Sequence, residues 1–194
     1  MKQLFVKYKV VIQFLGVFLG SYVLLSLLYG FYLHISNGTS HTPDVVTRTV
    51  AQQSSAILKS LGYNAAVIAN NDQPSMQLWV NQHQVGTIIE GCNAISIIIL
   101  FIAFVLSFAS HWKKTVLFLL GGAVLIYSIN IVRIAILAMA LYQYPQYQEV
   151  LHTVVFPGII YGLVFLLWVF WVRSNTKKNT EHSIEGEQNK RLYE

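Results

Sequence analysis

The amino-acid sequence predicts an all-α polytopic membrane protein with about four transmembrane helices, both termini in the cytoplasm, and a small α+β segment outside the membrane between the first two helices. Composition is the first observation behind this prediction. The chain has 194 residues, of which 55% are hydrophobic and only 11% charged, against about 25% charged in an ordinary soluble domain. The second observation is that four runs contain no charged residue or a single one: 10–33, 91–112, 115–148 and 150–172. Each run is long enough to supply the roughly 20 helical residues that cross a bilayer.

The chain divides into four parts by composition. Residues 1–33 are expected to form a cytoplasmic N-terminus and the first transmembrane helix. A cleaved signal peptide is the alternative, but the apolar run is about twice the usual length and no A-x-A-type site follows Leu33. Residues 34–90 are expected to form an extracytoplasmic helix plus short strands, and residues 91–173 a three-helix membrane core. Residues 174–194 are polar, of mixed charge and without periodicity, which predicts a disordered cytoplasmic tail.

The positions of lysine and arginine set the predicted orientation. Basic residues cluster before the first apolar run, after the second and after the fourth: Lys2, Lys7, Lys9, Lys113, Lys114, Arg173, Lys177, Lys178, Lys190 and Arg191. The connection YQYPQYQE at 142–149 has neither Lys nor Arg, and segment 34–90 has only Arg48 and Lys59. Both termini are therefore expected inside an inner or plasma membrane, with 34–90 and 142–149 outside. The net charge of +5 follows from this topology, and no nucleic-acid partner is expected.

The segment 34–90 reads as a small ordered module. Thr42, Pro43 and Asp44 are typical of a helix start. The apolar residues Val46, Val50, Ile57 and Leu61 recur on one helix face, and Gly62 favours a stop. The stretches YNAAVIA, MQLWV and VGTIIE then alternate with turn-rich sequence and predict short strands. Because so few residues bury little core alone, the module is expected to rest on the outer ends of the helices.

Cys92, the only cysteine of the chain, lies in IEGCNAIS, where the last predicted strand meets the second apolar run. Glu90 precedes it by two residues. An odd cysteine outside the cytoplasm indicates an intermolecular disulfide or a reactive thiol. The alternative is an inert buried cysteine that packs as a small hydrophobe.

Arg133 is the only charged residue in the third apolar run. An arginine within a membrane costs about 2.5–3.5 kcal/mol on insertion scales, and such residues normally face a protein interior and mark a functional path. It lies about nine residues from the outer end, roughly 13 Å, and Asn130 at i−3 shares its helix face. The alternative is an arginine that binds helices together through free carbonyl groups.

His152 begins the fourth apolar run from the outer side, three residues after Glu149. A histidine there can accept a proton from a thiol and return it to a leaving group. Glu149 would orient the imidazole or cap the helix start. The other histidines show no pair with metal-ligand spacing, so neither a metal nor a cofactor is expected.

The predicted topology brings Cys92, Arg133 and His152 to one leaflet. A thiol, a base and a fixed cation at one depth form a nucleophilic site. His152 would deprotonate Cys92, and Arg133 would stabilise the thiolate and the oxyanion formed when a carbonyl is attacked. Pro157 removes a helix hydrogen bond and would kink the fourth helix beneath the site.

These motifs together resemble the exosortase family of membrane transpeptidases, most closely its short F-type branch. The matching residues are EGCNAIS around Cys92, NIVRI around Arg133 and HTVVFPGIIYG from His152. The resemblance implies that Cys92, Arg133 and His152 are a catalytic triad at the extracytoplasmic face. Many exosortases have about eight helices and a glycine soon after the cysteine, whereas this chain has about four and Asn93-Ala94, which leaves open a partner subunit that completes the core.

The resemblance also implies a substrate class. Exosortases act on secreted proteins that end in a sorting signal: a short motif, a transmembrane helix and a basic cluster. Cys92 would form an acyl-enzyme thioester, which a glycan, a lipid or water would resolve, so transfer and hydrolysis both stay open. The substrate helix would bind against the bundle in the bilayer. GVFLG (16–20) and GIIYG (158–162) have the small-xxx-small spacing of close helix packing, for which contacts within the chain are the expected use.

Two other function classes fit parts of the sequence. In a membrane scaffold or assembly factor, Arg133 and Cys92 would only pack. In a small transporter, Arg133 would be a counter-ion, but repeat symmetry and paired broken helices, which transporters often show, are not seen.

Overall fold

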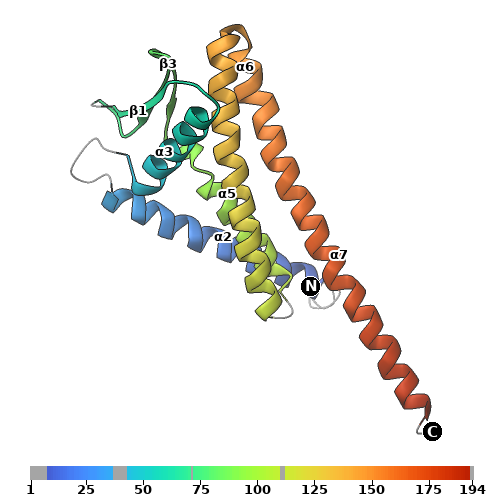
Figure 1. The fold of residues 1–194 in the computed structure, drawn as a ribbon. Helices are drawn as coiled ribbons and strands as arrows, with labels where there is room; N and C mark the ends of the chain where they lie inside the picture. Colours follow the sequence, from blue (N-terminus) through green and yellow to red (C-terminus); the bar gives the residue numbers. More distant parts are fainter. Residues whose placement is uncertain (1–7, 37–42, 71, 110–111, 193–194) are drawn as a thin grey trace.

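The computed structural model describes residues 8–36, 43–70, 72–109 and 112–192, and beyond Ser174 it describes the backbone alone. Lys2, Lys7 and Thr42, on which parts of the topology and helix-start predictions rest, lie outside these ranges. The described chain is mostly helical (Figure 1). Its helices are α2 (Lys9–Ser36), α3 (Val45–Ser60), α4 (Ile95–Ser107), α5 (Trp112–Gln143), α6 (Gln148–Val150) and α7 (Phe156–Leu192).

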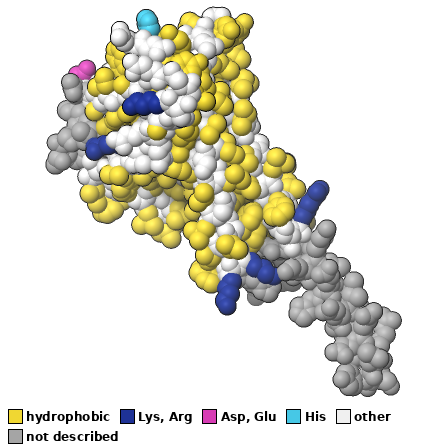
Figure 2. Space-filling model, in the orientation of Figure 1, with side chains coloured by type: hydrophobic (Ala, Val, Ile, Leu, Met, Phe, Trp, Pro, Cys, Tyr) yellow, Lys and Arg dark blue, Asp and Glu magenta, His cyan; other side chains and the backbone are white. Residues whose placement is uncertain are grey.

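Among the described residues, 3 helical segments are long and apolar enough to cross a membrane: Val11–Ser36, Trp112–Gln143 and Pro145–Ser174. The chain is therefore a multi-pass membrane protein. Hydrophobic side chains cover much of the face shown in Figure 2, and Lys and Arg side chains lie near its lower end and at its upper left.

The predicted second transmembrane helix is shorter than a span. Helix α4 has 13 residues, about 20 Å at 1.5 Å per residue, whereas the hydrocarbon core is about 30 Å thick. At both of its ends, the apolar run 91–112 contains residues that lie outside helix α4. A 3-10 turn, η1 (Glu90–Cys92), and the residue Ala94 precede the helix, and Phe108 caps its end.

Aromatic and small residues pack α4 against its neighbours. The Phe104 ring stacks on Trp168 of α7 with centroids 4.3 Å apart and meets Phe14 of α2 edge-on at 6.0 Å. The Phe101 ring lies on Gly122 of α5, where a Cβ atom would overlap the ring. This close approach of α4 and α5 therefore requires glycine.

The glycines of the two small-xxx-small motifs do not have the predicted role within the chain. A Cβ added at Gly16, Gly20, Gly158 or Gly162 would meet nothing within 4 Å. The close helix contact is made instead at Gly122, a position that the motif spacing did not indicate.

The segment between α2 and α4 contains the predicted helix and three strands. Asp44 caps α3, because its carboxylate accepts hydrogen bonds from the N–H groups of Val46 (3.0 Å) and Thr47 (3.1 Å). Pro43 precedes this cap. Gly62, with φ 89°, ends the helix in the left-handed conformation that favours glycine.

The strands β1 (Ala65–Ala69), β2 (Met76–Val80) and β3 (His83–Ile88) form one antiparallel sheet in the order β1-β2-β3. Asn81 and Gln82 both have positive φ, as the two-residue turns that join twisted strands require. The buried face of the sheet packs with α3 against Ile134, Ala135 and Ala138 of α5. The module is thus held on the C-terminal half of α5 (Figure 1).

The buried face of α3 differs from the predicted one at its C-terminal end. Val50 is fully buried, but Leu61 is 55% exposed and Leu58 is buried in its place. Leu61 follows the last helical residue, so its side chain no longer continues the helical face. Two small polar residues, Ser54 and Ser55, are also buried on this helix.

The polar C-terminal segment differs from the predicted disordered tail, because the backbone of α7 continues as a helix to Leu192. No proline follows Pro157, so no residue of this segment lacks the N–H group that the helix needs.

The hairpin between α5 and α7 is not a simple loop. After Gln143 the chain forms a 3-10 turn, η2 (Pro145–Tyr147), then α6, then a π-helical turn, η3 (Leu151–Val155), before α7 begins. Pro157 has no N–H to donate to the carbonyl of Thr153, so the ordinary α-helical pattern cannot pass through this point. The wider turn directly precedes it, where the sequence predicts a kink.

Candidate active site

Cys92 ends a sharp turn from strand to helix. Its N–H donates to the carbonyl oxygen of Ile89 at 2.8 Å, which closes η1 directly after β3. Ala94 then has φ 64°, a left-handed conformation that costs a non-glycine residue about 1 kcal/mol. The thiol is therefore half-buried in the turn before α4 rather than in the membrane helix itself.

Asn93, next to the thiol, holds this turn in place. Its Nδ2 donates to the hydroxyl of Tyr29 at 2.8 Å and to Oγ1 of Thr47 at 3.1 Å, and its Oδ1 accepts from the N–H of Ile95 at 3.0 Å. The side chain is only 1% exposed. One amide thus connects α2, α3 and the start of α4 at the residue after Cys92. Because these bonds are buried, their loss leaves several unpaired polar groups, which is costly.

Asn130 connects Cys92 to Arg133. Its Nδ2 donates to the backbone carbonyl of Cys92 at 2.8 Å, and its Oδ1 accepts from Nη1 of Arg133 at 3.3 Å. The i−3 spacing predicts the second of these bonds. The first joins α5 to the turn that carries the thiol.

The side chain of Arg133 is only partly hydrogen-bonded in the part of the chain that the structure describes. Within the part of the chain that the structure describes, its Nε atom is buried without a hydrogen-bond partner. The guanidinium also lies within electrostatic range of the Cys92 thiol. An unpaired buried donor normally costs about 1–3 kcal/mol.

His152 lies in the π-helical turn η3. Its side chain is exposed, and in the described part of the chain it makes no hydrogen bond to Glu149. Single π turns within helices occur frequently at functional sites. Here the turn presents the imidazole beside the Cys92 turn.

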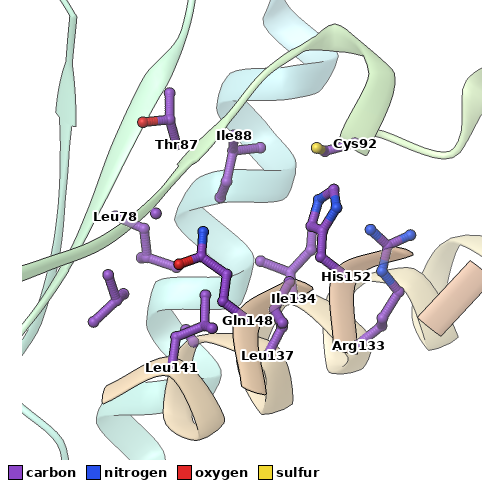
Figure 3. A pocket seen from close by; sticks show the side chains of 13 residues that line it. Leu78, Thr87, Ile88, Cys92, Arg133, Ile134, Leu137, Leu141, Gln148 and His152 are labelled. Atoms are coloured by element: carbon purple, nitrogen blue, oxygen red, sulfur yellow. The ribbon is translucent and has the colours of Figure 1, made fainter. Parts of the chain in front are cut away.

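A pocket of about 140 Å³ is lined by Cys92, Arg133 and His152 together. Figure 3 shows the Cys92 sulfur, the His152 ring and the Arg133 guanidinium at one end of this pocket, each from a different segment of the chain. Its remaining wall is formed by β2, β3, α5 and α6: Leu78, Val85, Gly86, Thr87, Ile88, Ile134, Leu137, Ala138, Leu141 and Gln148. A thiol, an imidazole and a guanidinium thus line one small, mostly apolar cavity.

A comparison with known protein families assigns the chain to one of them. The family model described as Transmembrane exosortase (Exosortase_EpsH) matches residues 10–175, which is most of the chain. The chain belongs to the transmembrane exosortase family. Neither the curated proteins nor the solved structures give a match.

The remaining candidates of this exosortase separate into two groups. Asn130 is buried and contacts both Cys92 and Arg133. Glu90 and Glu149 are exposed and do not line the pocket.

Gln148 and Asn93 are parts of the site that sequence reasoning did not single out. Gln148 lines the pocket from the hairpin. The sequence gives little to identify Gln148, because it is one of several similar polar residues in the segment YQYPQYQE. Asn93 had a clearer signal, because a polar amide directly follows the candidate nucleophile.

Proposed function

We propose that this exosortase is a membrane-embedded cysteine transpeptidase of the short F-type, which cleaves C-terminal sorting signals of exported proteins. The observation that carries this proposal is the single pocket lined by Cys92, Arg133 and His152. These residues come from a strand-to-helix turn, a long helix and a π-helical turn, so the fold brings them together from distant parts of the sequence.

In the proposed reaction, His152 accepts the thiol proton of Cys92, and the sulfur attacks a peptide carbonyl of the substrate. The tetrahedral intermediate collapses when its C–N bond breaks and His152 protonates the departing amine. The C-terminal helix of the substrate leaves with that amine, and a thioester remains on Cys92. An amine or hydroxyl of a glycan or lipid acceptor, or water, then attacks the thioester and releases the thiolate.

Arg133 is the proposed oxyanion and thiolate stabiliser. Its unpaired Nε supports this role, because a buried donor without a partner is available to an oxygen that gains charge only during the reaction. Removal of one such donor typically costs about 10²–10³-fold in kcat. The bond to Asn130 fixes the guanidinium and leaves Nε available.

The side of the membrane follows from the basic residues. Lys113 and Lys114 begin α5, and Arg173 follows the apolar part of α7, whereas the pocket lies near the α5–α7 hairpin. Under the positive-inside rule, the pocket opens on the extracytoplasmic side of the cell membrane. Exported substrates with a C-terminal transmembrane segment meet the site there, with or without an accessory membrane partner.

The test is the fate of the substrate in cells that carry single substitutions. Cys92→Ala and Cys92→Ser should both accumulate uncleaved sorting substrate in the membrane. Ser96→Ala, an exposed position four residues further along the chain, is the matched control and should process normally. In the native enzyme, mass spectrometry should find the acyl fragment on Cys92. Normal processing by both Cys92 variants would exclude the enzyme and favour a scaffold.

A further inference from the structure

Strand β3 has a free edge that leads directly to Cys92. The sheet order is β1-β2-β3, so among the described residues β3 pairs with β2 on one side only. The strand ends at Ile88, and Cys92 closes the turn that follows. An edge strand presents backbone N–H and C=O groups that are available for another strand.

The active-site pocket runs along this edge. Four consecutive residues of β3, Val85 to Ile88, line it. Because successive side chains of a strand point to opposite faces, a cavity lined by four in a row contacts the edge of the strand and not one face alone.

Gly86 leaves this space open. A Cβ atom added there would meet nothing within 4 Å. Gly86 pairs with Leu78, which also lines the pocket, and residues directly opposite in an antiparallel pair share a face. A side chain at position 86 would therefore project toward the pocket.

The wall opposite β3 is apolar and comes from α5. Leu137 and Leu141 lie along it, and Gln148 and His152 close it from the hairpin (Figure 3). A backbone edge on one side and apolar side chains on the other form the arrangement that binds an extended peptide as an added strand. A folded ligand would not match the row of backbone groups.

The direction of β3 fits the direction of a sorting signal. His83, at the start of β3, lies beside Tyr142 near the end of α5, with ring centroids 6.1 Å apart. The turn after β3 contacts Asn130, deeper along the same helix. A substrate that descends from an exported domain toward its own membrane helix runs the same way. Its chain would lie parallel to β3, with the residues before the scissile bond beside the strand.

We infer that the segment just before the scissile bond of the substrate binds as a parallel strand on the free edge of β3. About four substrate residues match Val85–Ile88 in length, at about 3.3 Å per residue. Alternate side chains of that segment face the α5 wall, which selects apolar residues there. This inference rests on the proposed function, since it takes Cys92 as the nucleophile.

The test measures how fast Cys92 is alkylated by acetyl-Val-Ala-Val-Ala-Gly chloromethyl ketone and by versions methylated at one backbone nitrogen at a time. Alkylation forms a C–S bond and releases chloride. Cys92 is the only cysteine, and label that is absent from Cys92→Ala is assigned to its sulfur rather than to a histidine. Methylation should slow labelling about five- to tenfold at alternate positions, where it removes a strand hydrogen bond, and less at the others. Losses that do not alternate, or labelling no faster than by chloroacetone, would overturn the inference.

A protein variant tests the same groove from the other side. Gly86→Leu should lower the ratio of peptide labelling to iodoacetamide labelling about tenfold, because the side chain would fill the pocket. Ala66→Leu adds an apolar side chain at an exposed position of β1 and should keep the wild-type ratio. An unchanged ratio in Gly86→Leu would contradict the inferred groove.

The His152→Ala variant distinguishes an error in the proposed catalytic role of His152 from an error in the inferred groove. If His152→Ala leaves the iodoacetamide rate of Cys92 unchanged while the methylated peptides still alternate, the groove stands and the catalytic role of His152 falls. If His152→Ala slows iodoacetamide but the peptides do not alternate, the catalytic role stands and the strand-addition inference falls.

Discussion

Asn130→Leu tests whether one amide positions the proposed nucleophile, Cys92, and the guanidinium of Arg133. The leucine has a similar size but removes both hydrogen bonds of a fully buried side chain. The bond to the Cys92 carbonyl, at 2.8 Å, is neutral and contributes about 1 kcal/mol. The bond from Arg133 involves a charge, but at 3.3 Å it is long, so the lower end of the charged range, about 1.5 kcal/mol, applies. The free energy of unfolding should fall by about 2.5 kcal/mol.

Substrate processing should fall further than stability alone explains. With Asn130 gone, neither the Cys92 turn nor the Arg133 guanidinium is held at its present position, and a misplacement of about 1 Å can cost about 10²-fold in rate. Unfolding is measured by titration with sodium dodecyl sulfate in mixed micelles, and processing by thioester formation on Cys92 at a temperature where the variant stays folded.

Tyr127→Phe is the matched control for Asn130→Leu. Tyr127 lies on the same helix, and its hydroxyl donates to Oε1 of Gln53 at an exposed position, 2.7 Å away. Its loss should cost about 1 kcal/mol or less and leave thioester formation at the wild-type rate. If Asn130→Leu also forms thioester at the wild-type rate, Asn130 does not position the site.

Three further substitutions test the packing that supports the site, each by its free energy of unfolding. Gly122→Ala should cost about 1–3 kcal/mol because the new methyl group overlaps the Phe101 ring, whereas Gly121→Ala, with nothing within 4 Å, should change little; equal effects would refute the packing argument. Ala94→Val should cost about 2 kcal/mol or more because φ is 64°, and Ala94→Gly should stay within about 1 kcal/mol of the wild type; a tolerated valine would show that the turn relaxes. Asp44→Ala should cost about 0.5–2 kcal/mol by removing the cap of α3, and Asp44→Asn should cost little; an equal loss in both would indicate that charge, not capping, matters.

The local patterns of the sequence predicted the local parts of the fold. Runs with at most one charged residue predicted the three long apolar helices, and turn residues separated the three strands of the sheet. The spacing of Asn130 and Arg133 predicted a contact within one helix, and the structure has it. Hydropathy did not show that α4 is short, because it cannot distinguish apolar residues in a helix from apolar residues used in a turn.

The bonds that position the site depend on contacts far apart in the chain. Asn93 bonds to Thr47 and Tyr29, which are 46 and 64 residues away, and Asn130 bonds to Cys92 over 38 residues. No periodicity or motif connects such positions. The topology did indicate that Cys92, Arg133 and His152 converge, because it fixes which helix ends face the same side.

The two hydrogen bonds of Asn130 divide the proposed triad into two parts. Asn130 bonds to the backbone carbonyl of Cys92 and to the guanidinium of Arg133, so a single residue of α5 connects the turn that carries the thiol to the cation. His152 stands on the far side of the hairpin, and among the described residues its side chain hydrogen-bonds to neither of them. Substitutions in the hairpin would therefore move the imidazole relative to the thiol and the guanidinium. Under the proposed mechanism, changes in proton transfer and in charge stabilisation should arise from separate sets of mutations.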